Sequence, residues 1–152
     1  MTTAFEAEPG YELRVRESFA RQAVMRTLDA RLETIEPGRV VITMQHRAEL
    51  TQQHGFLHAG IVSTALDSAC GYAAFSLMPA DAAVLTIEFK VNLLAPARGP
   101  RFRFEGLVGK AGRTISVVDG SAWQTDEHGR ETRVATMTAT VMTVRGREGL
   151  KH

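Results

Sequence analysis

The stretch HGFLHAGIVSTALDSACGYAAFSL, residues 54–77, predicts the one long helix of this chain that is buried on most of its sides. At 3.6 residues per turn, its apolar side chains fall on one broad stripe, made of Ile61, Val62, Ala65, Leu66, Ala69, Tyr72, Ala73 and Leu77. Asp67 is the only carboxylate in this segment and lies away from the cap position where aspartate is usually found. Asp67 is therefore the first candidate functional residue.

The composition indicates a single globular domain. The chain has 152 residues, of which 44% are hydrophobic, and this suffices for one core of ordinary size. A net charge of +1, from 18 basic and 17 acidic residues, gives no reason to expect nucleic acid or an anionic membrane as a partner. The single cysteine, Cys70, can form no internal disulfide and is expected in the core, as in a protein of the reducing cytoplasm.

The location expected from the sequence is cytoplasmic. The first residues, MTTAFEAEPGYELR, lack the basic and apolar regions of a signal peptide. No apolar run is long enough to span a bilayer. We therefore expect an intracellular protein that does not bind membranes.

Local patterns on either side of the central helix predict one further helix and six strands. Apolar spacing indicates a helix over residues 12–28, and the alternation of apolar and polar residues over 84–94 gives the clearest strand. Pro37-Gly38 predicts a hairpin turn, and Gly120 predicts a β-bulge. The other strands are expected at residues 30–36, 39–45, 101–110, 114–124 and 131–144, and flexible ends at residues 1–11 and 145–152.

This order of elements predicts an α+β fold in which a long, curved antiparallel sheet wraps the central helix. Such a sheet ends in two open edges, whose backbone N–H and C=O groups need partners. Pairing edge to edge with a second copy is the usual solution. We therefore expect at least a homodimer.

Two groups of motifs resemble those of a known family. The first is GFLHAG at residues 55–60, which leads into the helix that bears Asp67 nine residues after the histidine. The second is TIEFKVNLLAP at residues 86–96, followed by KAGRT at residues 110–114. Over residues 12–144, the chain resembles the hotdog-fold acyl-CoA thioesterases of the phenylacetate-pathway (PaaI-like) type.

The resemblance implies a single hotdog domain over residues 12–144, with an antiparallel sheet of five to six strands around one long central helix, plus an N-terminal helix. It also implies hydrolysis of acyl-CoA by a homodimer, which is expected to associate further into a homotetramer, a dimer of dimers. Two positions depart from the family pattern Asn-x-x-Gly-x-x-His-Gly-Gly. Gln52 stands in place of the asparagine, and Ala59 replaces the first glycine of the pair.

Thioester hydrolysis needs a group that stabilises the oxyanion, and a base or nucleophile on the other side of the carbonyl. The N-terminus of the central helix offers N–H groups at Ala59 and Gly60, and Asp67 is the only acid in that helix. Direct attack by Asp67 and general-base catalysis both remain open. Gly60 and Asp67 lie about 10 Å apart along the axis, so one carbonyl carbon cannot easily contact both. The site should therefore combine the helix N-terminus of one subunit with Asp67 of its partner, as the resemblance also implies.

The other candidate residues have supporting roles. His58 would orient the substrate carbonyl or hold the loop, and Gln52 would hydrogen-bond in the same region. Thr86 lies where the family places a hydroxyl, and it is a candidate to position the attacking water. Coenzyme A enters as part of the substrate, and the candidates for binding its nucleotide end are the hairpin residues Lys110, Gly112, Arg113 and Thr114.

Neither a cofactor nor a metal is expected. His54 and His58 have the i, i+4 spacing of a metal-binding pair. However, Gly55 intervenes, and no glutamate follows His54 as it does in the zinc-binding helix motif.

Two other function classes are compatible with the fold. A hydratase or dehydratase acting on acyl thioesters would need a histidine and a carboxylate poised at a carbon atom. A non-catalytic acyl-CoA binding module would keep the pocket and lose the carboxylate. Asp67 favours hydrolysis over both classes. Aryl and medium-chain acyl groups both fit the apolar residues near the helix start.

Overall fold

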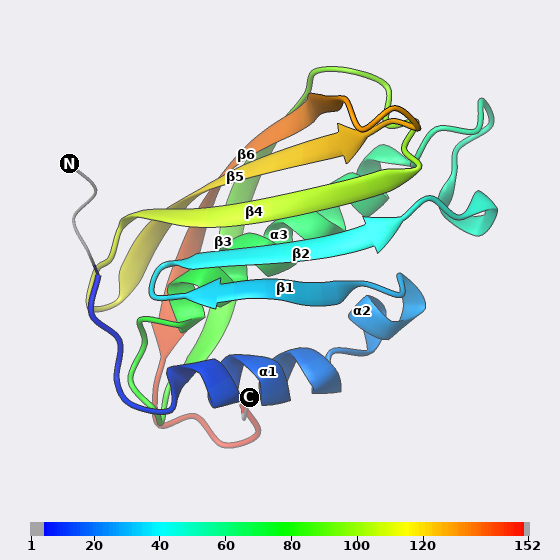
Figure 1. Ribbon diagram of the computed structural model, residues 1–152. Helices are drawn as coiled ribbons and strands as arrows, with labels where there is room; N and C mark the ends of the chain where they lie inside the picture. The colour runs from blue at the N-terminus through cyan, green and yellow to red at the C-terminus, as the bar shows by residue number, and fades with distance from the viewer. Residues whose placement is uncertain (1–4, 151–152) are drawn as a thin grey trace.

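The computed structural model describes residues 5–150, in which a curved sheet wraps one long helix (Figure 1). Two short helices, α1 (Tyr11–Arg21) and α2 (Ala23–Thr27), precede the sheet, and the long helix is α3 (Ala59–Phe75). A 3-10 turn, η1 (Ala48–Leu50), comes before α3. The strands are β1 (Arg31–Glu36), β2 (Arg39–Gln45), β3 (Ala83–Leu93), β4 (Arg101–Lys110), β5 (Ile115–Thr125) and β6 (Glu131–Val144).

The sheet has the strand order β1-β2-β4-β5-β6-β3, and every neighbouring pair is antiparallel. The predicted α+β architecture is confirmed. Strands β2, β4 and β6 begin and end at the predicted residues, β1 begins one residue later, and β3 and β5 are each displaced by one residue at both ends. One edge of the sheet, β1, lies beside α1, whereas the other edge, β3, pairs only with β6 among the described residues (Figure 1).

The helix predicted over residues 12–28 is broken in two. Gln22 adopts an extended conformation, with φ −76° and ψ 99°, and separates α1 from α2. Its backbone N–H bonds to the carbonyl of Phe19, which ends α1 in a tight turn. The break directs the Gln22 side chain to α3, where its Oε1 accepts a hydrogen bond from the Ser68 hydroxyl at 2.9 Å.

Two glycines let α3 approach the sheet closely. Gly106 of β4 pairs directly with Gly120 of β5, and both face α3. A Cβ on Gly106 would collide with the backbone carbonyl of Ala69, and one on Gly120 would lie 2.9 Å from the Cys70 sulfur. The prediction of a β-bulge at Gly120 is wrong, because the pairing is regular there and the register shifts lie elsewhere, between Val108 and Lys110 and between Ala122 and Trp123. This glycine serves close packing against the helix.

Gly106→Ala is expected to destabilise the fold by about 3 kcal/mol, because the added methyl group would overpack a closed core. The colliding atoms belong to the backbone of α3, which cannot move without displacing the helix from the sheet. Gly109→Ala is the matched control on the same strand, since its Cβ would lie 3.5 Å from Asp119 Oδ2, an ordinary contact. Urea denaturation compares the two variants. Equal free energies of unfolding would contradict this account of the helix packing.

The edge strand β3 departs from the regular alternation predicted for it. A β-bulge between Thr86 and Glu88 adds one residue, Ile87, opposite β6. Before the bulge, Val84 packs toward the core and Thr86 faces α3, whereas after it Val91 packs toward the core. The bulge therefore changes which residues of β3 face the helix, and it lets Thr86 reach α3.

The open edge expected of such a sheet carries an apolar surface. The large apolar side chains of β3 and of the residue after it are between 40% and 55% exposed: Leu85, Ile87, Phe89, Leu93 and Leu94. Isolated exposed apolar residues are ordinary, but a group of them along an open sheet edge is typical of an interaction surface. The described part of the chain leaves these side chains uncovered.

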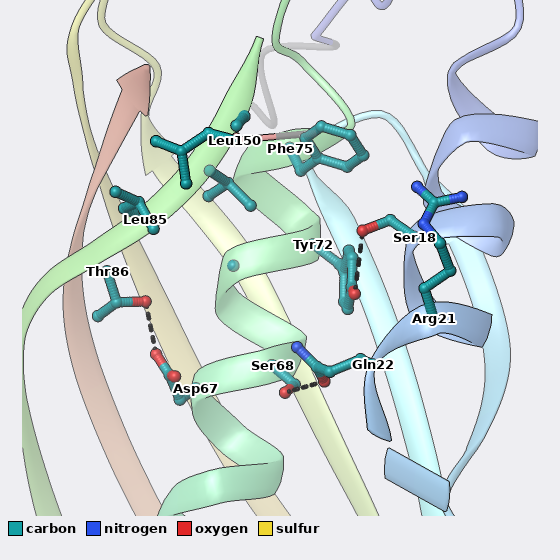
Figure 2. Close-up of a pocket in the computed structure, with 13 residues that line it drawn as sticks. Ser18, Arg21, Gln22, Asp67, Ser68, Tyr72, Phe75, Leu85, Thr86 and Leu150 are labelled. Atoms are coloured by element: carbon teal, nitrogen blue, oxygen red, sulfur yellow. Dashed lines mark hydrogen bonds between the residues drawn. The ribbon is translucent and has the colours of Figure 1, made fainter. Parts of the chain in front are cut away.

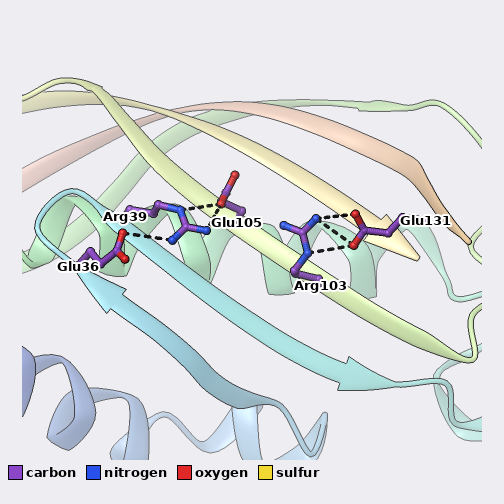
Figure 3. A network of polar contacts seen from close by, with 5 residues as sticks. All are labelled: Glu36, Arg39, Arg103, Glu105 and Glu131. Atoms are coloured by element: carbon purple, nitrogen blue, oxygen red, sulfur yellow. Dashed lines mark hydrogen bonds and ion pairs between the residues drawn. The ribbon is translucent and has the colours of Figure 1, made fainter. Parts of the chain in front are cut away.

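Ion pairs lie across the outer face of the sheet, away from α3 (Figure 3). Arg39 of β2 contacts Glu36 at 3.2 Å and Glu105 of β4 at 2.7 Å. Arg103 contacts both carboxylate oxygens of Glu131 at 3.0 Å. Because these side chains are partly exposed, each pair contributes at most about 1 kcal/mol to stability. This face is polar, in contrast to the apolar edge at β3.

The ends of the chain lie partly outside the described residues. The flexible ends predicted at residues 1–11 and 145–152 include residues 1–4 and 151–152, of which the structure gives no description. Phe5 packs against the core, and Leu150 lies in the groove described below. The flexibility of both ends stays a prediction. No described helix is long and apolar enough to cross a membrane.

Candidate active site

Asp67 lies on the one face of α3 that the sheet leaves open. Most of α3 is buried, whereas Gly60, Thr64, Asp67 and Gly71 follow one another along a face that solvent reaches. Strand β3 flanks this face on one side, and α1 flanks it on the other (Figure 2). A groove of about 570 Å³ follows the C-terminal half of this face and is lined by Asp67 and Gly71.

Asp67 is hydrogen-bonded to a strand hydroxyl and has no cationic partner among the described residues. Thr86 donates its hydroxyl hydrogen to Asp67 Oδ1 at 2.7 Å (Figure 2). Burial raises the pKa of Asp67 above the usual aspartate value of 3.8, and the hydrogen bond from Thr86 opposes this effect. A partly buried carboxylate with a raised pKa is a better proton acceptor than an ordinary surface aspartate.

The N-terminus of α3 has one amide without an acceptor among the described residues. His58 is the N-cap, and its Nδ1 accepts a hydrogen bond from the Gly60 N–H at 2.8 Å. The His58 carbonyl accepts from the N–H groups of Ile61 and Val62. The expectation that Gly60 offers a free N–H is therefore wrong, because the cap uses it. The N–H of Ala59 remains as the candidate donor to an oxyanion.

The central helix is shorter than the predicted segment 54–77 at both ends. It begins at Ala59, because the chain before His58 forms turns held by bonds between Gln52, Gly55 and Phe56. It ends at Phe75.

Ala59 borders a cavity of its own, with a volume of about 400 Å³. Gln52 also lines this cavity. Its side-chain carbonyl accepts a hydrogen bond from the His54 backbone N–H, so the amide NH₂ group is left to donate. Most of the wall is apolar and includes Phe56, Leu57, Val62, Leu93, Leu94 and Val134.

The two candidate catalytic groups of one chain belong to different cavities. Asp67 does not line the cavity at Ala59, and Ala59 does not line the groove at Asp67. Eight residues of α3 separate them, which corresponds to about 12 Å along the helix axis. A single chain therefore does not bring both groups to one carbonyl carbon.

The residues predicted to bind coenzyme A lie at the C-terminal end of α3. Gly112, Arg113 and Thr114 line a cavity of about 360 Å³ there, and Lys110 is not among its lining residues. A Cβ on Gly112 would collide with the carbonyl of Ile115, so the hairpin itself requires this glycine. Arg113 and Thr114 are thus the stronger candidates for contacts with a ligand.

The described residues hold no metal-binding cluster. No group of three or more His, Cys, Asp or Glu side chains lies close enough to bind an ion. Of the two histidines with i, i+4 spacing, His58 caps α3, and His54 lies against the ring of Phe56. The candidate site consists of a carboxylate, hydroxyls, amides and one backbone N–H.

The sequence alone does not reveal the polar side of the groove. Ser18 of α1 hydrogen-bonds the Tyr72 hydroxyl at 3.2 Å, and Gln22 accepts from Ser68 (Figure 2). The only signal in the sequence is the i, i+4 spacing of Ser68 and Tyr72, which places both side chains on one face of the helix close to Asp67. Ser18 and Gln22 reach these two residues because α1 packs beside α3, with Phe19 against Tyr72.

Residues 54–131 match the family model described as the Thioesterase superfamily. This segment extends from the turn before α3 to the start of β6. A protein of Saccharolobus solfataricus named "Putative esterase SSO2140" is 35% identical over 96 residues, which are 63% of this chain and 68% of that protein.

Solved structures agree with this match. A thioesterase family protein from Silicibacter pomeroyi is 60% identical, with a TM-score of 0.89 over 90% of this chain and 100% of that chain. The E. coli PaaI protein from the phenylacetic acid degradation operon has a TM-score of 0.81 over 93% of this chain and 98% of PaaI, and its 18% identity supports the fold alone. The chain therefore belongs to the thioesterase superfamily, has the predicted hotdog fold of its PaaI-like members, and is a hydrolase of thioester bonds.

Proposed function

We propose that the protein is an acyl-CoA thioesterase in which Asp67 of one subunit and the Ala59 N–H of another act on the same thioester. The position of Asp67 carries the proposal. It lies on the open face of α3, has no cation beside it among the described residues, and has its pKa raised by burial. A carboxylate in such a place costs stability, and groups of this kind are typical of catalytic sites.

A homodimer would bring the two catalytic groups together. The open face of α3 adjoins the uncovered apolar edge of β3, so one second copy could cover both. A two-fold axis across this surface would pair the two β3 edges and set the two copies of α3 antiparallel. The N-terminus of each helix would then approach the middle of the other. We propose this homodimer as the catalytic unit and a dimer of dimers as the full assembly.

In the proposed site, a water molecule beside Asp67 and Thr86 attacks the thioester carbon. Asp67 takes the proton of the water, and the Ala59 N–H donates a hydrogen bond to the oxyanion. The intermediate then loses its C–S bond, and the proton on Asp67 passes to the coenzyme A thiolate. Direct attack by the carboxylate would give an anhydride that water opens, and it would use the same groups.

The residues around the Ala59 N–H would position it. His58 and Gly60 form the cap that fixes the first turn of α3, and Gln52 lines the cavity beside Ala59. Coenzyme A is part of the substrate, and we propose no other cofactor. The phosphates of coenzyme A would lie at the hairpin, where Arg113, Thr114 and the backbone of Gly112 are candidate contacts and Lys110 is nearby.

Two features of the groove argue for hydrolysis over the other function classes. A hydratase or dehydratase would need a histidine near the carboxylate, but no described histidine lines the groove, and His58 is engaged in the cap. A non-catalytic binding module would have no need of a partly buried carboxylate. Aryl and medium-chain acyl groups both remain candidates for the substrate.

Thiol release from a panel of short, medium, long and aryl acyl-CoAs tests this function. We expect turnover of at least one class, and sedimentation of a dimer or a larger assembly. Burial raises the pKa of Cys70 to about 12, so the protein's own thiol should not react with the dye that detects coenzyme A. Binding of acyl-CoA without turnover of any member would move the assignment to a non-catalytic module.

The rate should depend on pH through the ionisation of Asp67. The Asp67 carboxylate must be ionised to accept a proton, and burial raises its pKa above 3.8. The plot of kcat/KM against pH should therefore have a rising limb whose midpoint lies above pH 3.8. The Thr86 hydroxyl stabilises the ionised form and lowers this pKa. Thr86→Val keeps the shape of the side chain and removes the hydroxyl, so the limb should move to higher pH. A limb that stays in place would mean that another group controls the rate.

A further inference from the structure

Polar groups that the proposed chemistry does not use gather in the groove beyond Asp67 (Figure 2). They come from α1 (Ser18 and Arg21), from the break after it (Gln22) and from α3 (Ser68 and Tyr72). The hydrogen bond between Ser18 and Tyr72 and that between Ser68 and Gln22 order four of them. The groove also has apolar surface, from Phe75, Leu85 and Leu150.

Arg21 is the one cation that lines this groove, and it has no ion pair or hydrogen bond within the described part of the chain. Its side chain extends beside Ser18 (Figure 2). Burial raises the pKa of the Tyr72 hydroxyl, whereas the bond to Ser18 and the charge of Arg21 lower it. Asp67 is instead bonded to Thr86 on the β3 side of the groove, whereas Arg21 lies on the α1 side (Figure 2). The cation therefore serves the far end of the groove, not the catalytic carboxylate.

Distance decides which part of a substrate would meet Arg21. Tyr72 follows Asp67 by five residues, which is about 7.5 Å along the helix axis. An acyl chain of about six to eight carbons spans this distance, at about 1.25 Å per bond along the chain. The pantetheine arm of coenzyme A is uncharged over about 15 Å before its first phosphate. An anion that binds Arg21 would therefore belong to the acyl group.

We propose that this protein prefers acyl-CoA substrates whose acyl group ends in a carboxylate, held by Arg21, Ser18 and Tyr72. The inference rests on the proposed function, because it assumes that the thioester carbon lies at Asp67. The methylene groups of such a chain would lie along the apolar surface. The guanidinium would donate to the carboxylate, and so would whichever hydroxyl accepts in the Ser18–Tyr72 hydrogen bond, because its own hydrogen is free. A methyl end would displace water from these groups without replacing its hydrogen bonds.

Two non-hydrolysable thioethers of equal chain length, S-hexyl-CoA and S-(5-carboxypentyl)-CoA, test the proposal by calorimetry. We expect the carboxylated thioether to bind the wild type about tenfold more tightly or better, as a charge-assisted pair allows. Arg21→Gln should remove this preference. Arg16→Gln is the matched control in α1, since Arg16 pairs with Glu12 at 2.8 Å and does not line the groove. It should keep the preference.

Thiol release from adipyl-CoA and hexanoyl-CoA provides the second readout. The ratio of their kcat/KM values should favour adipyl-CoA in the wild type and fall toward one in Arg21→Gln. Equal affinities of the wild type for the two thioethers would overturn the inference, even if hexanoyl-CoA were hydrolysed and the proposed function held. Tight binding of the carboxylated thioether through Arg21 without hydrolysis of any thioester would uphold the acyl preference and overturn the proposed function.

Discussion

Asp67→Asn is expected to lower kcat by about a thousandfold, the scale of a lost general base. Asparagine keeps the size of the side chain, and its carbonyl oxygen can still accept the hydrogen bond from Thr86. It cannot take a proton from water or attack the thioester. Asp119→Asn is the matched control, because Asp119 is an exposed aspartate of β5 outside the groove. Thiol release measures both variants, and turnover by Asp67→Asn within tenfold of the wild type would remove Asp67 from the mechanism.

The same substitution should raise the melting temperature at neutral pH. Burial raises the pKa of Asp67 in the folded state, so ionisation of this group weakens the fold as pH rises through that pKa. The asparagine variant carries no such penalty. Its advantage should be present at pH 7 and disappear at pH values below 3.8, where aspartic acid is also neutral. A lower melting temperature of the variant at pH 7 would mean that the ionised carboxylate stabilises the fold.

Ala59→Pro is expected to lower kcat by about a hundredfold to a thousandfold, the usual effect of losing one oxyanion donor. Proline removes the one amide of the first turn that has no acceptor in the described chain. The fold should tolerate it, because proline is favoured at the first helical position. The preceding residue, His58, already has φ −59° and ψ 139°, which is the conformation that a following proline requires.

Ala59→Gly controls for the shape of this position, because glycine keeps the N–H. It should retain most of the activity. Circular dichroism and thermal denaturation would establish that Ala59→Pro is folded. A folded Ala59→Pro variant with the kcat of the wild type would place the oxyanion elsewhere.

Much of the sheet is predictable because its signals are local. Strand β4 lies between Pro100 and the Ala111-Gly112 turn, and β2 follows the Pro37-Gly38 turn, so both ends are marked in the sequence. The central helix is likewise visible as an apolar segment. Asp67 stands out within it for a simple physical reason: a carboxylate is costly to bury, and its presence there calls for an explanation.

The errors arise where contacts distant in sequence decide the local structure. Gly120 suggested a bulge, but its role depends on how closely α3 approaches β5. The bulge at Ile87 carries no glycine and lies in a segment of regular alternation, so nothing local marks it. The use of the Gly60 N–H depends on the orientation of the His58 ring, which apolar periodicity does not encode.

The candidate site also contains some residues that the sequence identifies and others that it does not. The sequence identifies Asp67 and Ala59, because both belong to one helix and to one motif. The wall of the groove at Arg21 and Gln22 depends on a break in the N-terminal helix and on packing of that helix beside α3. Its residues lie more than forty positions from Asp67.

The central claim is that two subunits share each site, and complementation tests it most directly. Asp67→Asn keeps the Ala59 N–H, and Ala59→Pro keeps the carboxylate, so each variant alone should be inactive. After subunit exchange at equal amounts, about half of the dimers would be mixed, each with one intact and one doubly altered site. The account predicts recovery of about one quarter of the wild-type activity. A mixture that contains mixed dimers and remains as inactive as the separate variants would contradict it.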